Sequence, residues 1–214
     1  MAGHTRREIL VTASATVLIG CTGPTSGTDT PTNVTTDPTT DTTTDAATDT
    51  STTDPGACDP TGADIEGPYW VEGVPVRGDL DLYGDPGPRL ALEGRVLDAD
   101  CAPIAGAIVE IWHADDEGAY DDAADGKYRG QVAADADGNY AFTTIVPGRY
   151  LNGATYRPSH VHAKVWVEGE LRLTTQLYFG SDPYNEGDTW FDEDRVIADL
   201  DDGDELVGAF DFVV

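Results

Sequence analysis

From about residue 58 to the end of the chain, short runs of alternating apolar and polar residues recur between turn signals such as Asp137-Gly138 and Glu168-Gly169. A period of two places the apolar side chains on one face of a β-strand, and no stretch keeps the 3.6-residue apolar period of a helix. The pattern predicts an all-β domain over residues 57–214, an antiparallel β-sandwich of about seven or eight strands. The clearest runs are 90–97, 107–112, 140–145, 160–167, 171–179 and 206–214.

Residues 1–20 have the pattern of an export signal. Arg6-Arg7 precede an apolar run, residues 9–20, that is too short to span a bilayer. The arginine pair resembles a twin-arginine signal, and Leu18-Ile19-Gly20-Cys21 resembles the lipobox of bacterial lipoproteins. We therefore expect an exported protein that is held at the cell envelope, and touches a membrane, only through a lipid on Cys21. An ordinary secretory signal with an incidental Cys21 is the alternative.

Residues 22–56 contain sixteen Thr and six Asp but no aromatic residue, Lys or Arg. Such a segment buries too little apolar surface to offset its ordering entropy, so it is predicted to be a disordered linker. The whole chain has 12 Lys and Arg against 40 Asp and Glu, a net charge of -28. Charge of this sign repels phosphate backbones and anionic lipids, which argues against nucleic acid as a partner.

Two cysteines, Cys58 and Cys101, remain once Cys21 is assigned to the signal. In an exported protein they are candidates for a disulfide that would pin the start of the domain to the turn at 100–103. Two unpaired thiols are the alternative.

A pair of histidines, His160-Val161-His162, begins one predicted strand. Side chains at positions i and i+2 of a strand point to the same face, so both imidazoles can converge on one point. The pair alone does not distinguish a metal site from two half-exposed histidines. Of the other two histidines, His4 lies in the signal, and His113 is interpreted as a residue that supports a site from behind its ligands or lies on the surface.

The sequence around the histidine pair carries further motifs. They are W-x-A-D-x-x-G-x-Y-D at 112–121, P-G-x-Y at 147–150, R-P-x-H-V-H at 157–162 and T-x-Q-L-Y-F at 174–179, preceded by E-G-P-Y-W at 66–70. In this order they resemble the intradiol ring-cleavage dioxygenase family, which includes catechol 1,2-dioxygenases and protocatechuate 3,4-dioxygenases. The resemblance covers residues 64–184.

The resemblance implies that Tyr120, Tyr150, His160 and His162 bind iron(III), with Tyr150 and His162 axial. A phenol is deprotonated when it binds such a strongly charged cation, and two phenolates offset much of the ferric charge. Two neutral imidazoles complete the set without adding charge. The implied reaction opens a catechol-type ring between its two hydroxyls with O₂, giving a muconate-type diacid and needing no organic cofactor.

Other residues take roles by the same resemblance. Arg157 matches an arginine that faces the bound ring and stabilises negative charge on it. Tyr150 would leave the metal and accept a substrate proton. Gln176 matches a glutamine that supports the ligands, and Pro68 and Tyr69 would line the ring pocket.

Several alternatives stay open. Tyr128 competes with Tyr120 for the first tyrosine position, although only Tyr120 has the right place after Trp112. Residues 94–98 and 103–107 resemble a transthyretin-like sandwich, so a non-enzymatic extracellular binding module is the rival function, and an inactive iron-binding relative is a third. The acidic run 199–205 is expected to be a solvated loop or turn, with calcium binding there as the alternative.

The chain also departs from well-known members of the family. The interval between Tyr150 and the histidine pair is short, and the long helical N-terminal region of catechol-type members is lacking. These departures leave the particular diol and the oligomeric state undetermined.

Overall fold

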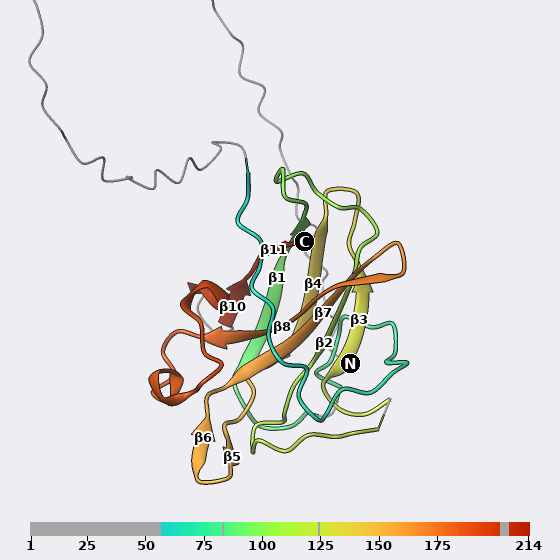
Figure 1. Cartoon of the computed structure of the whole chain (residues 1–214). Coiled ribbons are helices and arrows are strands. Elements are labelled where there is room, and N and C mark those ends of the chain that lie inside the picture. The colour runs from blue at the N-terminus through green and yellow to red at the C-terminus, as the bar shows by residue number, and fades with distance from the viewer. Residues whose placement is uncertain (1–56, 83, 124, 202–205) are drawn as a thin grey trace, which may run out of the picture. The chain divides into compact units, whose positions relative to one another are not determined.

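The computed structural model describes residues 57–82, 84–123, 125–201 and 206–214 (Figure 1). The predicted signal peptide, Cys21 and the linker lie outside these residues. Among the described residues there is no α-helix, and hence no helix that could span a membrane. The strands are β1 (Arg89–Leu97), β2 (Ile108–Trp112), β3 (Arg129–Ala133), β4 (Asn139–Ile145), β5 (Tyr150–Asn152), β6 (Thr155–Arg157), β7 (His160–Val167), β8 (Glu170–Phe179), β9 (Val196–Asp201), β10 (Leu206–Ala209) and β11 (Phe212–Val213), with short 3₁₀ turns at Asn185–Gly187 and Glu193–Arg195.

The main sheet folds into two facing halves. One half has the order β4-β1-β10-β9 and the other the order β8-β7-β2-β3, and they are joined where β9 pairs with the end of β8. Alternation along each strand sends one set of side chains into the space between the halves. The core there includes Leu90, Leu92, Phe142, Val109, Ile111, Val161 and Val165.

The all-β prediction is confirmed, and each predicted run forms a strand, the last one divided into β10 and β11. The sheet is mixed rather than wholly antiparallel, because β1 pairs in parallel with β10 and β11, and β8 with β9. Strands β3, β5, β6 and β9 were not predicted, so the strand number exceeds the prediction. The acidic run is only partly a loop, since residues 199–201 complete β9 and residues 202–205 lie outside the described part.

A segment without regular strands, residues 61–76, crosses the outer face of the second half-sheet. Along its course Asp64 N–H donates to Thr174 O of β8 at 2.9 Å, and the Gln131 side chain of β3 donates to Val74 O at 2.9 Å. We call residues 61–76 the covering segment. It explains why both faces of β7 are buried, although the strand contacts the core with only one of them.

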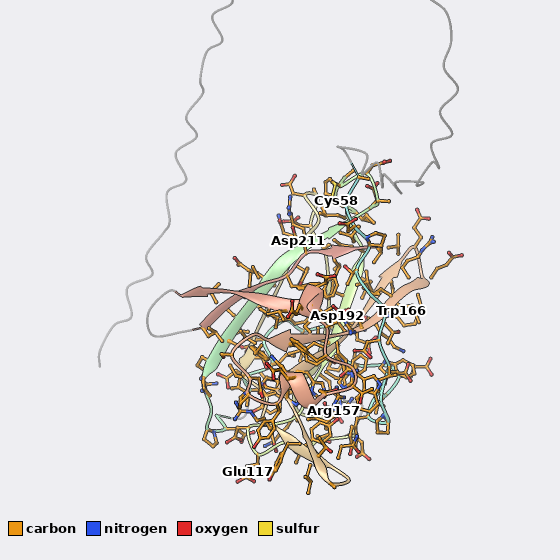
Figure 2. All side chains as sticks on the ribbon, turned by 60° about the vertical axis from the view of Figure 1, so that its left-hand side comes forward. Cys58, Glu117, Arg157, Trp166, Asp192 and Asp211 are labelled. Atoms are coloured by element: carbon orange, nitrogen blue, oxygen red, sulfur yellow. A yellow bond between two sulfur atoms is a disulfide. The ribbon has the colours of Figure 1, made fainter. Side chains whose placement is uncertain are left out.

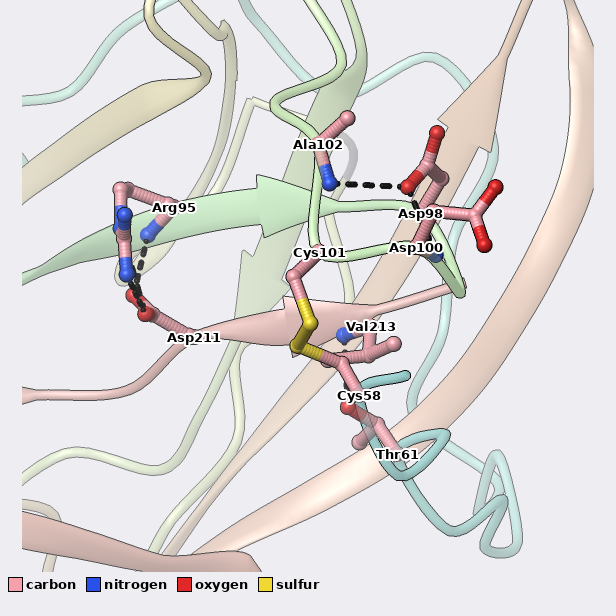
Figure 3. Close-up of a disulfide and its surroundings, with 9 residues drawn as sticks. All are labelled: Cys58, Thr61, Arg95, Asp98, Asp100, Cys101, Ala102, Asp211 and Val213. Carbon is pink, nitrogen blue, oxygen red and sulfur yellow. Dashed lines mark hydrogen bonds and ion pairs between the residues drawn. A yellow bond between two sulfur atoms is a disulfide. The ribbon is translucent and has the colours of Figure 1, made fainter. Parts of the chain in front are cut away.

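The predicted disulfide between Cys58 and Cys101 is present, with a Cα–Cα distance of 5.3 Å (Figure 3). Cys101 lies in the turn that follows β1, and Cys58 N–H donates to Ala99 O at 3.0 Å. The bridge therefore fixes the start of the domain beside the end of β1, just before the covering segment begins. Figure 2 shows Cys58 at one end of the domain and Arg157 near the other.

Candidate metal centre

The two histidines of the candidate site project from the outer face of β7. His160 and His162 share this face, while Val161 and Ala163 point into the core. Their ring centroids are 4.9 Å apart, and both side chains are buried. Trp112, opposite His162 in the β2–β7 ladder, stacks on its imidazole with centroids 4.8 Å apart. The stack holds the His162 ring in one orientation.

The two tyrosines come from two loops that are hydrogen-bonded to each other. Gly148 N–H donates to Asp115 O at 2.7 Å, which joins the loop before Tyr150 to the loop before Tyr120. Gly118 has φ +84°, and a Cβ there would clash with the backbone just before Tyr150. A glycine at this position thus lets the two tyrosine loops approach closely.

All four predicted ligands meet at one point. The Tyr120 hydroxyl lies 3.2 Å from His160 Nε2. The Tyr120 ring centroid is 5.7 Å from that of Tyr150 and 6.0 Å from that of His162. The Tyr150 and His160 ring centroids are 5.6 Å apart. The structure therefore brings together side chains that are 42 positions apart in sequence (162 − 120), as the prediction required.

Burial controls the protonation of these side chains. It raises the pKa of Tyr120 well above its usual value, and the neighbouring Tyr150 adds to the rise. It also lowers the pKa of His160 to about 4, helped by the positive charge of Arg157, and holds the pKa of His162 well below its usual value. Both imidazoles are consequently neutral at physiological pH, which is the form that binds a metal.

The hydrogen bonds of the two histidines fit a metal on this side of the rings. His160 Nδ1 lies 2.7 Å from Pro158 O, which makes Nδ1 the protonated nitrogen and leaves a lone pair on Nε2, toward Tyr120. His162 Nδ1 and Gln176 Oε1 have no hydrogen-bond partner within the described residues, although the two residues are opposite each other across β7 and β8. Gln176 is thus a cross-strand neighbour of His162, but its side chain makes no hydrogen bond to the imidazole; it donates to Ile65 O at 3.1 Å instead.

The donor set selects the kind of metal. In the described part of the chain, no group of three or more His, Cys, Asp or Glu side chains could hold a metal ion. A metal here depends on the phenolic oxygens of Tyr120 and Tyr150. Two oxygen donors that become anionic on binding, with two neutral nitrogens, fit a hard, highly charged cation such as iron(III).

Arg157 lies directly beside the tyrosine cluster. It is the ladder partner of Tyr150 in the β5–β6 hairpin, and its positive charge and hydrogen bond oppose the burial-driven rise in the pKa of Tyr150. Its Nε donates to Asp188 Oδ2 at 2.7 Å, and its guanidinium lies 4.6 Å from the Trp190 ring centroid. Asp188 and Trp190 therefore hold the buried arginine in place.

The covering segment brings Pro68 and Tyr69 to the site. Gly67, with φ +73°, crosses so close above His162 that a Cβ would lie 3.2 Å from Cε1 of its imidazole. Tyr69 then stacks face to face on Tyr120, with centroids 4.2 Å apart and planes 8° from parallel. Pro68 is exposed beside it. Tyr69 thus packs directly against a candidate ligand.

Two buried charged residues of the sheet, Lys164 and Glu110, hold the covering segment on both sides of Pro68 and Tyr69. Lys164 Nζ lies 2.5 Å from Glu66 and 3.4 Å from the centroid of the Trp70 ring. Its ladder partner Glu110 accepts a 2.7 Å hydrogen bond from Trp70 Nε1. Burial raises the pKa of Glu110, while the indole hydrogen bonds oppose the rise. Sequence reasoning assigned no role to this pair, because each residue alone resembles an ordinary surface charge.

The competing residues have other partners. The Tyr128 hydroxyl donates to Asp85 at 2.9 Å, and the residue is buried. His113 is buried rather than on the surface, with Nδ1 2.7 Å from Ala114 O and Nε2 2.7 Å from Thr144 Oγ1. Both ring nitrogens of His113 are therefore used within the protein.

Substituting Tyr128 tests this division between the two tyrosines. We expect Tyr128→Phe to leave the visible absorption of the iron-loaded protein unchanged, because its hydroxyl contacts Asp85 rather than the cluster. Tyr120→Phe, the matched change, should shift or bleach the same band, since it removes one of two phenolate donors. An absorption spectrum of each variant at equal iron content shows which of the two tyrosines binds the metal. The reverse result would make Tyr128 the ligand.

Sequence reasoning missed the residues that hold Arg157. Asp188 and Trp190 lie in the loop after the 3₁₀ turn at Asn185–Gly187, and Tyr178 Oη is 3.3 Å from Arg157 Nη2. Asp188 is 31 positions from Arg157, in a loop without a regular pattern. The local sequence offers no signal for this contact.

Comparison with known proteins agrees with this geometry. A family model described as Dioxygenase matches residues 65–213. Chlorocatechol 1,2-dioxygenase of Pseudomonas sp. (strain P51) is 37% identical over 178 residues, covering 70% of this chain and 68% of that protein. Catechol 1,2-dioxygenase 2 of Acinetobacter lwoffii is also 37% identical, over 56% of this chain and 51% of that protein. The chain thus spans about half to two thirds of these relatives.

Solved structures show the same fold. The dioxygenase domain of a dioxygenase–carbohydrate-binding protein fusion from Streptomyces sp. SirexAA-E superposes with a TM-score of 0.67 at 38% identity, covering 73% of this chain and 98% of that chain. The 3-chlorocatechol 1,2-dioxygenase of Rhodococcus opacus 1CP gives a TM-score of 0.65 at 27% identity, covering 72% and 71%. The chain belongs to the intradiol ring-cleavage dioxygenase family of oxidoreductases, which works with non-haem iron.

Proposed function

We propose that this chain is an iron(III) dioxygenase that cleaves catechol-type rings between the two hydroxyls, using Tyr120, Tyr150, His160 and His162 to hold the metal. The convergence of these four side chains carries the proposal. The curated relatives, which are catechol and chlorocatechol 1,2-dioxygenases, support the reaction type. The products are muconate-type diacids that contain both atoms of O₂.

The protein's residues divide the remaining work. The metal supplies the Lewis acidity that ionises the diol and the electron acceptor that lets its ring react with O₂. Tyr150 accepts one of the two protons that the diol must lose, and its neighbour Arg157 faces the negative charge that develops on the ring. Tyr69, Trp112 and the covering segment exclude water from the cluster.

Iron content, colour and product test the proposal together. We expect one iron per chain and a red-brown colour, from charge transfer between phenolate and iron(III). Catechol in air should then be converted to the ring-opened diacid with one O₂ consumed per diol. The measurements are metal analysis, a visible spectrum and oxygen uptake matched to product by chromatography. A protein that stays colourless after iron and air would contradict the metal assignment.

The other functions considered have less support. A transthyretin-like binding module has no need for two half-buried tyrosines and two neutral imidazoles at one point, and the family match extends through all four positions. An inactive iron-binding relative would show the colour without oxygen uptake. Colour and oxygen uptake, measured in the same experiment, therefore distinguish these two alternatives from the proposed enzyme.

We also propose that the protein is exported and anchored by a lipid on Cys21. The signal and lipobox patterns support this proposal, and so does the Cys58–Cys101 disulfide, because such bonds persist mainly in oxidising compartments. We expect Cys21→Ser to move most of the protein from the membrane fraction to the soluble exported fraction, measured by immunoblot. Retention of the variant in the membrane fraction would contradict the anchor.

A further inference from the structure

A cleft of about 170 Å³ lies beside Arg157, outside the ligand cluster. One wall is the β5–β6 hairpin, with Asn152, Thr155 and Tyr156, and the other contains Thr189 and Trp190. In Figure 1 the hairpin projects from one end of the domain, and Figure 2 shows Arg157 near that end. The short interval between Tyr150 and Arg157 reduces this hairpin to two strands of three residues each.

Arg157 connects the cleft to the metal centre. The arginine lines the cleft, and it is also the ladder partner of the candidate ligand Tyr150. A diol that binds the metal through its two hydroxyls turns the opposite edge of its ring away from the cluster. A side arm on that edge would reach the cleft by passing Arg157, the residue that the cleft shares with the surroundings of the metal centre.

The charges in the cleft are already matched. The Arg157 guanidinium is paired with Asp188 at 2.7 Å, and both side chains are nearly inaccessible to solvent. No other lysine, arginine or histidine lines the cleft. A carboxylate on the side arm would thus find no unmatched cation, in a chain whose net charge is -28.

The neutral polar groups of the cleft, in contrast, are free to bind. The Asn152 amide and the Thr155 and Thr189 hydroxyls make no hydrogen bond to other described residues, and all three side chains are exposed to the cleft or to solvent. The exposed Tyr156 ring adds an apolar surface beside them. Neutral donors and acceptors next to an aromatic face suit a hydroxylated, uncharged group.

We propose that this cleft is a subsite for the side arm of the substrate, and that the preferred substrates are catechols with a neutral, hydroxyl-bearing arm rather than a carboxylate. The proposal rests on the proposed function. It deepens that function, because the ligand set does not identify a side arm, and the curated relatives are named for catechol and chlorocatechol, which have none.

Three diols of similar size test the subsite with the iron-loaded protein. They are 4-(2-hydroxyethyl)catechol, 4-propylcatechol, which lacks the hydroxyl, and 3,4-dihydroxyphenylacetate, which has a carboxylate instead. Binding is measured by calorimetry without O₂, and kcat/KM with O₂. We expect the hydroxyethyl compound to exceed the propyl compound by about fivefold in both, the scale of one neutral hydrogen bond, and to exceed the carboxylate by more.

Two substitutions in the hairpin connect that preference to the cleft. Asn152→Leu and Thr155→Val should each reduce the preference for the hydroxyethyl over the propyl compound, and leave the rate with unsubstituted catechol within about twofold, since neither side chain contacts the ligand cluster. Thr143→Val is the matched control, because Thr143 is an exposed residue of β4 in the other half-sheet. It should leave the preference unchanged.

The possible outcomes distinguish a failure of the proposed subsite from a failure of the proposed reaction. Equal binding of the hydroxyethyl and propyl compounds, or tighter binding of the carboxylate, would overturn the subsite even if all three rings are cleaved. A preference that survives both hairpin substitutions would place the recognition elsewhere and overturn it too. If the hydroxyethyl preference appears in calorimetry while no diol is cleaved, the subsite stands and the proposed reaction fails.

Discussion

Replacing His162 by Leu is expected to remove the iron and, with it, ring cleavage. The imidazole is buried between Trp112 and the covering segment, so no water or other side chain can take its place as a ligand. Loss of even an indirect support of a ligand costs about 10- to 100-fold in metal affinity, so loss of the ligand itself should cost more than about 100-fold. Metal analysis after dialysis and oxygen uptake with catechol measure the two effects.

The control for this substitution is another buried histidine. His113 has the same side chain and similar burial, but both of its ring nitrogens have partners within the protein. His113→Gln should therefore retain iron and colour at the parent level. If His113→Gln loses the metal while His162→Leu keeps it, the ligand assignment is wrong.

Loss of Arg157 is expected to slow ring cleavage by about 10²- to 10³-fold, the scale of removing one preorganised electrostatic donor. Iron content, colour and diol binding should change little, because Arg157 lies beside the cluster and is not one of the four ligands. Single-turnover oxygen uptake and spectral titration with catechol separate the chemical step from binding.

The ion pair with Asp188 determines how this substitution must be made. Arg157 and Asp188 are both buried, so Arg157→Ala alone leaves an unpaired buried carboxylate, at a cost of about 3–5 kcal/mol in unfolding free energy. The double variant Arg157→Met with Asp188→Asn avoids that charge and should remain folded. If it cleaves catechol at the parent rate, Arg157 has only a structural role. If it loses iron, the arginine supports the histidine pair.

The sequence predicted the parts of this protein that depend on local patterns. Alternating apolar residues located the strands of the core, and the spacing of His160 and His162 placed both on one face of β7. The two tyrosine positions came from a family resemblance, since a tyrosine alone does not distinguish a ligand from an ordinary buried residue. Their convergence with the histidines is visible only in the folded chain.

The parts that were not predicted depend on contacts between distant residues. Strand β9 pairs in parallel with β8 over only a few residues, and β3 begins with the polar Arg129-Gly130-Gln131. The covering segment shows no alternation of apolar and polar residues. Its hydrogen bonds connect distant residues, such as Ile65 and Gln176, which are 111 positions apart. Local patterns carry no information on partners at such distances.

The position of the disulfide has a mechanical consequence. Tension on the chain N-terminal to Cys58 reaches the domain at the bond to Cys101, before any residue of the covering segment (Figure 3). The covalent bridge passes the tension to the turn after β1, and from there to a strand that is held by β4 on one side and β10 on the other. The hydrogen bonds that keep residues 61–76 over the candidate metal centre are thereby shielded from pulling. A domain attached through its N-terminal chain can thus be dragged by moving surroundings while Tyr69 keeps its place on Tyr120.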